Sequence, residues 1–481
     1  MPDVFTNALT DRPILPLARN RPRHPEEFAR PGGRRLFGVL RHGGREMVTA
    51  VKSHSTVARP RALPGSVTWL AGAGMILLIA LYVYHAWGIR WVPLRSALTD
   101  FWSYVAAGQA VLDGAPLYEE GKAALPTIGG TFKYTPFAAV LFVPLVGIPV
   151  SVAPALVLGA NVFALLAVVW TGWAMLGHAR DHGRLAATAA LGALSLGLQP
   201  VLWNNTWGQV NLILMAMVVL DLALPDHHRA KGALVGVAAG IKLVPGIFIV
   251  YLLLTRRFRA AAVSASAVAA TVGVGFLVLP GESWRFWTGN VADANRIVGS
   301  AFTLGSENQT LRGVIGRALG DAEPPALLWL SVAGLVAVVA LAVAVLASRQ
   351  GNELLAVATV GVTGVLIAPM GWSHYWVWFV PFLVLGAHAA YVNRSRLMLA
   401  STAAGYLLLF AWPIGTNIGL PFPGLLFAKD GLPDTAVTAL QSLHVTVGLV
   451  LLASAAVHVV GQAADRPRDL APGFAAGRVL Q

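Results

Sequence analysis

The 481-residue sequence contains no cysteine, which excludes disulfide bonds and thiolate metal sites. Charged residues are also scarce. They make up 12% of the chain, whereas 56% of the residues are hydrophobic and the mean hydropathy is +0.66. A soluble protein carries about twice that share of charged residues. We therefore expect lipid to surround most of this chain.

Motifs for nucleotide chemistry are missing as well. The sequence has neither a Gly-x-x-x-x-Gly-Lys-Ser/Thr phosphate loop nor a dinucleotide-binding fingerprint, which argues against ATP or nucleotide-sugar chemistry on the inner side. No Asp-x-Asp pair stands between residues 90 and 133, and no cluster of His, Asp and Glu has the spacing of metal ligands. We therefore expect neither a metal nor another cofactor.

Long uncharged tracts indicate the fold class. Five tracts without Asp, Glu, Lys or Arg exceed the roughly 20 residues that a helix needs to cross about 30 Å of hydrocarbon, and they cover residues 134–177, 185–220, 324–348, 354–393 and 397–428. The sequence predicts an all-α polytopic membrane protein with about ten to twelve transmembrane segments. We place full crossings near residues 66–89, 150–177, 184–200, 206–225, 258–280, 324–348, 353–370, 374–391, 396–415 and 437–461.

Two further apolar segments are interrupted. Residues 134–149 contain three prolines, and residues 231–255 contain Lys242 and Pro245. If both are re-entrant or broken helices, which is acceptable where irregular backbone lines a protein cavity, both termini and all basic connectors are cytoplasmic. If both are full crossings, the termini stay inside but the connectors 178–184 and 226–231 move outside.

The net charge of +13 is concentrated outside the apolar tracts. Twelve cationic residues precede residue 64, in a stretch without apolar periodicity, so we expect residues 1–63 to form a disordered basic cytoplasmic tail. Residues 64–461 form the expected membrane domain, and 462–481 a cytoplasmic C-terminal tail. The positive-inside rule explains the basic connectors. An RNA-binding tail is an alternative, but attraction to anionic lipid explains its charge as well, and we expect no nucleic-acid partner.

The ten-crossing arrangement leaves four longer or aromatic segments outside, at residues 90–133, 281–323, 371–375 and 414–435. Loops of more than about 12 to 15 residues in compact proteins are more often functional than decorative. Aromatic side chains suit a ligand with one apolar and one hydroxylated end. The sequence therefore predicts helical outer loops around an aromatic-lined chamber at the outer interface.

The first outer loop holds an isolated carboxylate, Asp100. Thr99 or Asp100 can cap a helix running from about residue 101 to 112, which Asp113 and Gly114 would end. Asp100 is therefore either a helix cap or a functional carboxylate that faces a cavity. We interpret Asp113 as a turn residue.

Six motifs together resemble glycosyltransferase family 87, a family of actinobacterial mannosyltransferases of the GT-C class. They are TDFWSY at residues 99–104 with Gly114 and Tyr118, KYTPF at 133–137, WGQVN at 207–211, GIKLVP at 240–245, ENQTL at 307–311 and SHY at 373–375. Each motif is weak alone, but their order and spacing are specific. The resemblance covers residues 66–458 and implies a GT-C-type helical bundle.

The resemblance implies transfer of mannose from polyprenyl-phosphate mannose to a glycolipid hydroxyl on the outer face of the plasma membrane. A single inverting displacement would form an α-1,2 link, and the acceptor could be a phosphatidylinositol mannoside, lipomannan or another glycan. In this family an aspartate of the first outer loop takes the acceptor's proton, and that role falls on Asp100. The departing phosphate needs donors or cations. Candidates are His374, Lys242, Arg312 and Lys133.

Further binding residues for donor or acceptor are expected within the same motifs. They are Tyr134, Gln209, Glu307, Asn308, Gln309, Trp372 and Tyr375. Each has a structural alternative. His374 and Trp372 can be interfacial anchors, Lys242 can extend to the cytoplasmic edge, Glu307 is expected to cap a helix near Thr310, and polar residues at 207–211 can join helices.

Two other classes of function compete with the enzyme. A transporter or flippase would explain many crossings and two broken helices, but the breaks near residues 140 and 244 show no matching sequence repeat. A non-catalytic scaffold for envelope assembly would have little use for isolated ionisable residues beside a cavity. The sequence therefore favours an enzyme over a transporter or a scaffold.

Overall fold

The computed structural model describes residues 72–74, 76, 80, 98–118, 132–291, 304–412, 424–428 and 431–464. Within these ranges the chain is helical, and its extended pairings are two isolated bridges, Leu198 with Phe410 and Asn308 with Trp372. The predicted tail 1–63 lies outside the described residues, as do most of the first expected crossing and of the tail 462–481.

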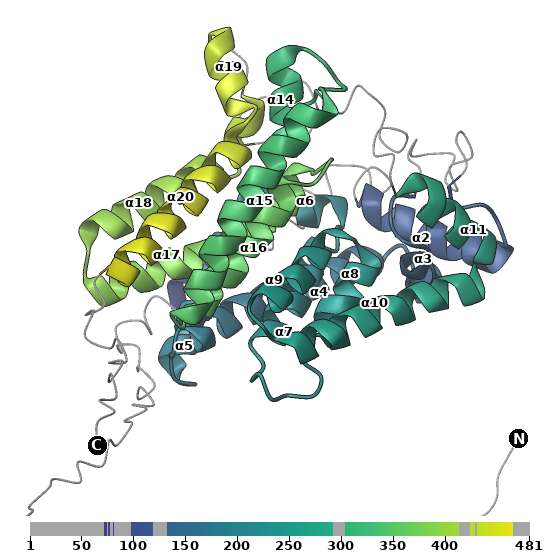
Figure 1. The fold of residues 1–481 in the computed structure, drawn as a ribbon, viewed down its shortest axis with the longest axis horizontal. Coiled ribbons are helices and arrows are strands. Elements are labelled where there is room, and N and C mark those ends of the chain that lie inside the picture. The colour runs from purple at the N-terminus through teal and green to yellow at the C-terminus, as the bar shows by residue number, and fades with distance from the viewer. Residues whose placement is uncertain are drawn as a thin grey trace, which may run out of the picture. The chain divides into compact units, whose positions relative to one another are not determined.

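The helices of the first part of the chain run from α2 to η3 (Figure 1). They are α2 (Thr99–Asp113), α3 (Pro136–Phe142), η1 (Val143–Gly147), α4 (Ala153–Met175), α5 (His182–Leu196), α6 (Gln199–Trp207), α7 (Asn211–Leu222), α8 (Ala233–Ile241), η2 (Val244–Gly246), α9 (Ile247–Leu254), α10 (Phe258–Val278), α11 (Pro280–Arg285) and the π-helix η3 (Phe286–Asn290).

The later helices begin at α14 and end at α20, and Figure 1 shows α15 and α16 side by side. They are α14 (Leu311–Leu319), α15 (Ala326–Arg349), α16 (Glu353–Leu366), η4 (Ser373–Trp378), α17 (Phe379–Asn393), α18 (Arg396–Leu409), η5 (Leu425–Phe427), α19 (Asp434–Leu440) and α20 (Leu443–Ala464).

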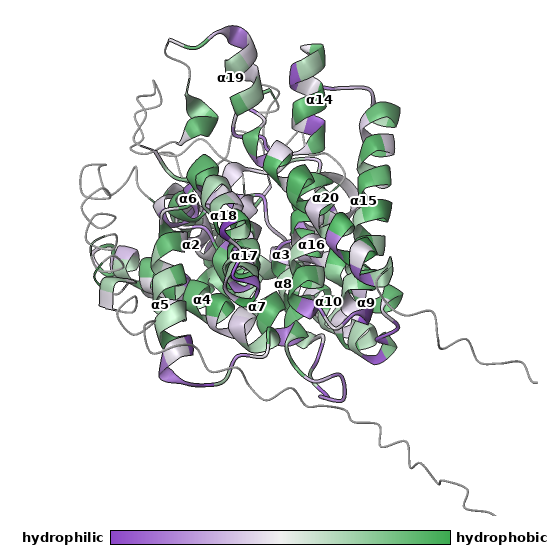
Figure 2. Ribbon diagram, turned by 90° about the vertical axis from the view of Figure 1, so that its left-hand side faces the viewer, coloured by the Kyte–Doolittle hydropathy of each residue, from purple (hydrophilic) through white to green (hydrophobic). Residues whose placement is uncertain are grey.

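Five helical stretches in the described residues are long and apolar enough to cross a bilayer, each with 21 to 24 residues. They are α4, α10, α15, η4 with α17, and α20. Figure 2 shows apolar residues along the helices and hydrophilic ones at several of their ends. Helices α16 and α18, at two other expected crossings, have 14 residues each. The prediction of an all-α polytopic membrane protein is confirmed.

The crossings predicted at residues 184–200 and 206–225 imply a short turn between them, near Asn204, and the structure differs from this. Asn204 lies inside α6, which meets α7 at 116°. Pro200 fits the first turn of α6, where its missing N–H needs no partner. Gly208 ends that helix with a φ of 68°, and a Cβ there would lie 2.7 Å from the Cβ of Phe101. The predicted turn is thus wrong in place, and the bend falls at residues 208–210.

Both interrupted segments change their backbone geometry, in agreement with one of the two arrangements that the sequence left open. Helix α3 gives way to the 3-10 helix η1 near Pro144, and α8 ends at Lys242, whose backbone is extended. Thr135 joins the two segments. Its hydroxyl accepts a hydrogen bond from Ala138 N at the start of α3 and donates one of 2.5 Å to Gly240 O in α8. The two breaks are therefore held next to each other.

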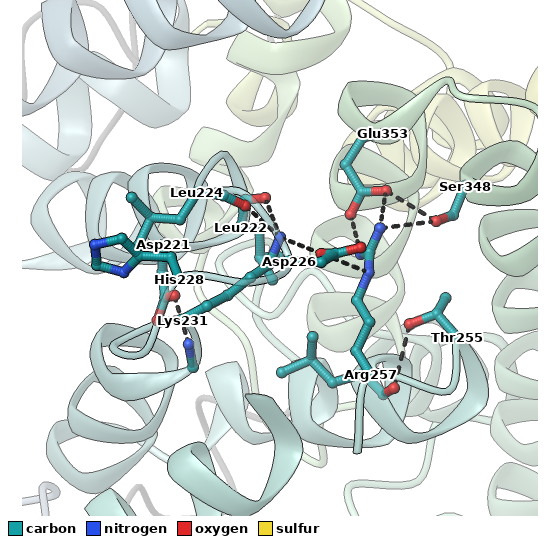
Figure 3. Close-up of polar contacts among 12 residues, drawn as sticks. Asp221, Leu222, Leu224, Asp226, His228, Lys231, Thr255, Arg257, Ser348 and Glu353 are labelled. Carbon is teal, nitrogen blue, oxygen red and sulfur yellow. Dashed lines mark hydrogen bonds and ion pairs between the residues drawn. The ribbon is translucent and has the colours of Figure 1, made fainter. Parts of the chain in front are cut away.

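An ion cluster joins three connectors that are distant in sequence (Figure 3). Arg257 Nη2 donates a 2.9 Å hydrogen bond to Oε2 of Glu353, the first residue of α16, and its Nε lies 3.2 Å from Asp226 Oδ1 after α7. Lys231 Nζ donates 2.8 Å to the same Asp226 oxygen. Ser348 at the end of α15 donates to Glu353 Oε2. One network thus fixes the ends of α7, α8, α10, α15 and α16.

Close packing of α16 depends on Gly361. A Cβ at this position would lie 2.1 Å from the indole ring of Trp378 in η4, well inside the contact distance of real carbon atoms. A glycine there lets the aromatic ring lie directly on the helix backbone. This contact sets how η4, which carries part of the candidate site, lies on the bundle.

Candidate active site

Helix α2 presents Asp100 in its first turn. The residue before the helix, Leu98, has a left-handed φ of 59°, and its N–H donates a 3.0 Å hydrogen bond to Thr206 O in α6. No side chain caps the helix, which rules out the alternative in which Thr99 or Asp100 is only a cap. The left-handed turn at Leu98 already draws both residues into the helix. Gly114, with a φ of 65°, ends α2 as predicted.

Gln209 holds the carboxylate of Asp100. Its Nε2 donates a hydrogen bond of 2.6 Å to Asp100 Oδ2. Gln209 comes from the bend between α6 and α7, and its side chain is buried. Its backbone oxygen accepts 3.1 Å hydrogen bonds from the amides of Asn161 and Asn204. Polar residues of α4 and α6 therefore fix the bend from which Gln209 reaches α2.

Two tyrosines complete this side of the network. Tyr134 donates its hydroxyl hydrogen to Gln209 Oε1 at 2.9 Å, and the hydroxyls of Tyr104 and Tyr134 lie 2.8 Å apart. Because Tyr134 uses its hydrogen on Gln209, Tyr104 is the donor between the two. Tyr104 lies four residues after Asp100, on the same face of α2. The oxygen of the Gln209 amide is therefore occupied, and its N–H group faces the carboxylate.

Two lysines bring positive charge to the carboxylate. Lys242, at the break after α8, donates 2.7 Å to Asn211 Oδ1 and lies 3.5 Å from the centre of the Tyr375 ring. Lys133 lies 5.3 Å from the ring centre of Trp372. Burial raises the pKa of Asp100 above the usual 3.8, although the Gln209 hydrogen bond and the charges of both lysines act to lower it.

The aromatic run at the start of η4 faces the same network. Trp372 and His374 have nearly parallel rings, 5° apart with centroids separated by 6.2 Å. The backbone oxygen of His374 accepts from Asn211 Nδ2 at 3.3 Å. His374 is buried, and its Nε2 has no hydrogen-bond partner in the described part of the chain. A buried polar atom without a partner carries a penalty unless a ligand or water satisfies it.

The segment before α14 is held by structural hydrogen bonds. Gln309 Nε2 donates to Ser306 O and to Gln441 O, at 2.7 and 2.6 Å, and its Oε1 accepts from His444 N. The Asn308 side-chain oxygen accepts from Thr310, and the Asn308 backbone pairs with Trp372. Both residues thus support the segment that carries Trp372.

Two other predicted residues of this segment lie around α14. Thr310 caps α14 by accepting a hydrogen bond from Gly313 N, so the prediction that Glu307 is the cap is wrong: the hydroxyl one residue before the helix already occupies that place. Arg312 lies over the ring of Trp329 at 5.8 Å and donates to Pro369 O. Arg312 therefore contacts α15 and the turn before η4.

Eight of the twelve predicted site residues form one connected network. They are Asp100, Lys133, Tyr134, Gln209, Lys242, Trp372, His374 and Tyr375. Sequence reasoning missed Tyr104, Asn161 and Asn204, and it included Asn211 in a motif without naming it as a site residue. The spacing of four between Asp100 and Tyr104 is a signal that could have been used.

The network can take up a proton and stabilise negative charge. Asp100 is a half-buried carboxylate, and the two lysines approach from the neighbouring broken segments. Among the described residues, no group of three or more His, Asp and Glu side chains could hold a metal ion. The network itself contains one carboxylate and two lysine side chains.

Known proteins share extended sequence similarity with this chain. The profile of glycosyltransferase family 87 matches residues 132–369. The chain is 31% identical to a polyprenol-phosphate-mannose-dependent alpha-(1-2)-phosphatidylinositol mannoside mannosyltransferase of Mycolicibacterium smegmatis, over 71% of this chain and 83% of the relative. It is 32% identical to the corresponding pentamannoside mannosyltransferase of the same organism, over 76% and 89%.

A relative from Mycobacterium tuberculosis, with the same printed name as the first, is 31% identical over 69% of this chain and 79% of its own length. No solved structure matches the chain. The identity and coverage of the relatives, together with the matched profile, show that this protein belongs to glycosyltransferase family 87.

Proposed function

We propose that this protein transfers mannose from polyprenyl-phosphate mannose to a hydroxyl of a phosphatidylinositol mannoside or a related glycolipid. The bond formed is an α-1,2 link. The relatives are named for this donor and this class of acceptor. The observation that carries the proposal is the 2.6 Å hydrogen bond from Gln209 to Asp100, which aims a carboxylate at a site bordered by two lysines.

The reaction is a single displacement. The acceptor oxygen attacks the anomeric carbon, the bond from that carbon to the phosphate oxygen breaks, and the hydroxyl proton passes to Asp100. The β-linked donor thereby gives an α-linked product. Burial raises the pKa of Asp100, so its carboxylate accepts a proton more readily than an exposed aspartate would.

The departing phosphate gains negative charge as its bond to the sugar breaks. In our proposal Lys242 and Lys133 stabilise that charge, and little acid assistance is needed. His374 offers its unpaired Nε2 to a phosphate or sugar oxygen, beside the parallel ring of Trp372. Tyr375 and Tyr134 flank Lys242. In our proposal the aromatic segment at residues 372–375 is supported by Glu307, Asn308, Gln309 and Arg312.

The distribution of charge supports an orientation in the membrane. Basic residues cluster in the connectors 178–184, 226–231, 256–259 and 393–396, and the positive-inside rule places such connectors in the cytoplasm. We therefore propose that Asp100 faces the outside of the plasma membrane and that both termini are cytoplasmic. Labelling of single introduced cysteines with a membrane-impermeant reagent tests this, because the natural chain has none.

A direct assay tests the proposed reaction. Purified protein in lipid nanodiscs is incubated with labelled polyprenyl-phosphate mannose and a panel of lipid acceptors, and products are read by mass and by the anomeric configuration of the new bond. We expect an added hexose in an α link. A folded preparation that forms no product with any acceptor, or one that forms a β link, contradicts the proposal.

A further inference from the structure

A continuous chain of hydrogen bonds runs from the cation to the carboxylate. Lys242 Nζ donates to Asn211 Oδ1 at 2.7 Å. Asn211 Nδ2 donates to Gln209 Oε1 at 3.2 Å, and Gln209 Nε2 donates to Asp100 Oδ2 at 2.6 Å. Two amides therefore connect residues of three separate segments: the break after α8, the bend before α7, and α2.

The two ends of this chain determine the direction of every bond in it. An ammonium group can only donate, so it must meet the oxygen of Asn211, whose nitrogen then faces Gln209. An ionised carboxylate can only accept, so Gln209 must turn its nitrogen to Asp100 and its oxygen to Asn211. Both ends demand the same orientation. The amide directions thus follow from chemistry, and they suit the ionised form of Asp100.

We infer that Asn211 is a positioning residue, which acts through Gln209 to hold an N–H donor on Asp100 and to tie that carboxylate to Lys242. This rests on the proposed function, in which Asp100 takes the acceptor's proton and Lys242 stabilises the phosphate. The chain sets the spacing between the proton acceptor and the cation before either substrate binds. Such preorganisation favours the transition state, in which both charges change together.

The position of Asn211 explains why it can serve this role. It is the first residue of α7 and is buried. Its amide nitrogen also lies 3.2 Å from Asn204 Oδ1 and 3.3 Å from His374 O, so Asn211 contacts both α6 and the start of η4. Rotation of its side chain would break several bonds at once. The residue is thus rigid enough to transmit a constraint.

Besides the Gln209 hydrogen bond, two charged groups act on the titration of Asp100. Lys133 and Lys242 stabilise its ionised form, and it acts in turn on Tyr104, Tyr134 and Tyr375. Loss of the donated hydrogen from Gln209, or of the amide that orients it, leaves the carboxylate less stabilised. The pKa of Asp100 should then rise further.

The test compares Asn211→Leu, Gln209→Leu and the double variant. Infrared difference spectra against Asp100→Asn protein follow the carboxylate band of Asp100 with pH, without any substrate. We expect Gln209→Leu to raise the pKa of Asp100 by about one unit or more, and Asn211→Leu to raise it in the same direction. The double variant should match Gln209→Leu alone, because the two residues act as one unit. The acid limb of kcat/KM should move equally.

Gln350→Leu provides the matched control. This amide donates to Val459 O between α15 and α20 and has no contact with the network. It should lower the melting temperature and leave the titration of Asp100 where it is. If Asn211→Leu behaves in the same way, or if the shifts of the single variants add, the inference is wrong. Asn211→Ala replaces the leucine variant if the latter does not fold. The infrared titration needs no turnover, so failure of the proposed reaction is detected separately.

Discussion

Replacement of Asp100 by asparagine separates chemistry from structure. In the wild-type protein Gln209 Nε2 donates a 2.6 Å hydrogen bond to the carboxylate of Asp100. The amide oxygen of the variant can still accept this hydrogen bond. Helix α2 begins directly after Leu98, whose backbone N–H donates to Thr206 O, so the start of the helix does not depend on the aspartate side chain. The variant should therefore fold, bind both lipids and lack a proton acceptor.

The expected loss of activity is large. A general base contributes about 10²- to 10⁴-fold to a rate, which corresponds to about 3 to 5 kcal/mol of barrier. Lys133 and Lys242 remain in place for the phosphate. We therefore expect kcat to fall by about that factor and the donor KM to change by less than about threefold.

The same substitution should not destabilise the fold. Burial keeps the folded pKa of Asp100 above its unfolded value of 3.8, so the unfolded chain loses the proton more easily. This penalty on the folded state is absent below pH 3.8, grows as the pH rises toward the folded pKa, and is complete above it. Asp100→Asn removes the penalty. Its melting temperature should equal or exceed that of the wild type at pH 7, with the difference shrinking toward pH 4.

Two measurements decide the outcome. Single-turnover transfer from labelled donor gives the rate, and scanning fluorimetry at several pH values gives the melting temperature. Undiminished transfer at neutral pH removes Asp100 from the role of base. An inactive variant with a clearly lower melting temperature would instead show that the carboxylate supports the structure.

Three further changes probe the cation, the ion cluster and the packing. Lys242→Met should lower kcat/KM about 10- to 100-fold. An unchanged kcat/KM would show that this lysine does not stabilise the departing phosphate. Arg257→Met leaves a largely buried Glu353 without its cationic partner and should lower the unfolding free energy by about 1 to 3 kcal/mol. Adding Glu353→Gln to the same chain should restore part of that free energy. Gly361→Ala should cost about 1 to 3 kcal/mol, whereas Gly334→Ala on α15, with open space around it, should be neutral in the same denaturation assay.

Local signals account for what the sequence predicted correctly. The Asp-Gly pair at 113–114 ended α2 where expected, and the prolines and Lys242 marked both broken helices. These features act through the backbone of their own segment, so neighbouring residues reveal them. The site motifs adjoin these breaks, which is why most of the named side chains gather in one network.

Contacts between distant segments account for the rest. Leu98 adopts a left-handed conformation that is uncommon for leucine, and its bond to Thr206 supports it. The bend at Gly208 depends on the close approach of Phe101. A buried asparagine such as Asn211 must find partners, but its spacing in the sequence does not tell which ones. For that reason its link between Lys242 and the Gln209–Asp100 pair emerges only from the structure.

The contact between Arg257 and Asp226 limits how the polypeptide can thread the bilayer. Two oppositely charged groups 3.2 Å apart cannot sit at opposite surfaces, so the stretch from α8 to α9 dips in and returns to the side it left. A single complete traverse by that stretch is incompatible with this contact. Helices α8 and α9, of nine and eight residues, each rise about 12 to 14 Å, roughly half of the 30 Å hydrocarbon layer. Lys242 stands at the apex of this hairpin, so in our proposal the sugar phosphate that meets it lies well below the headgroups.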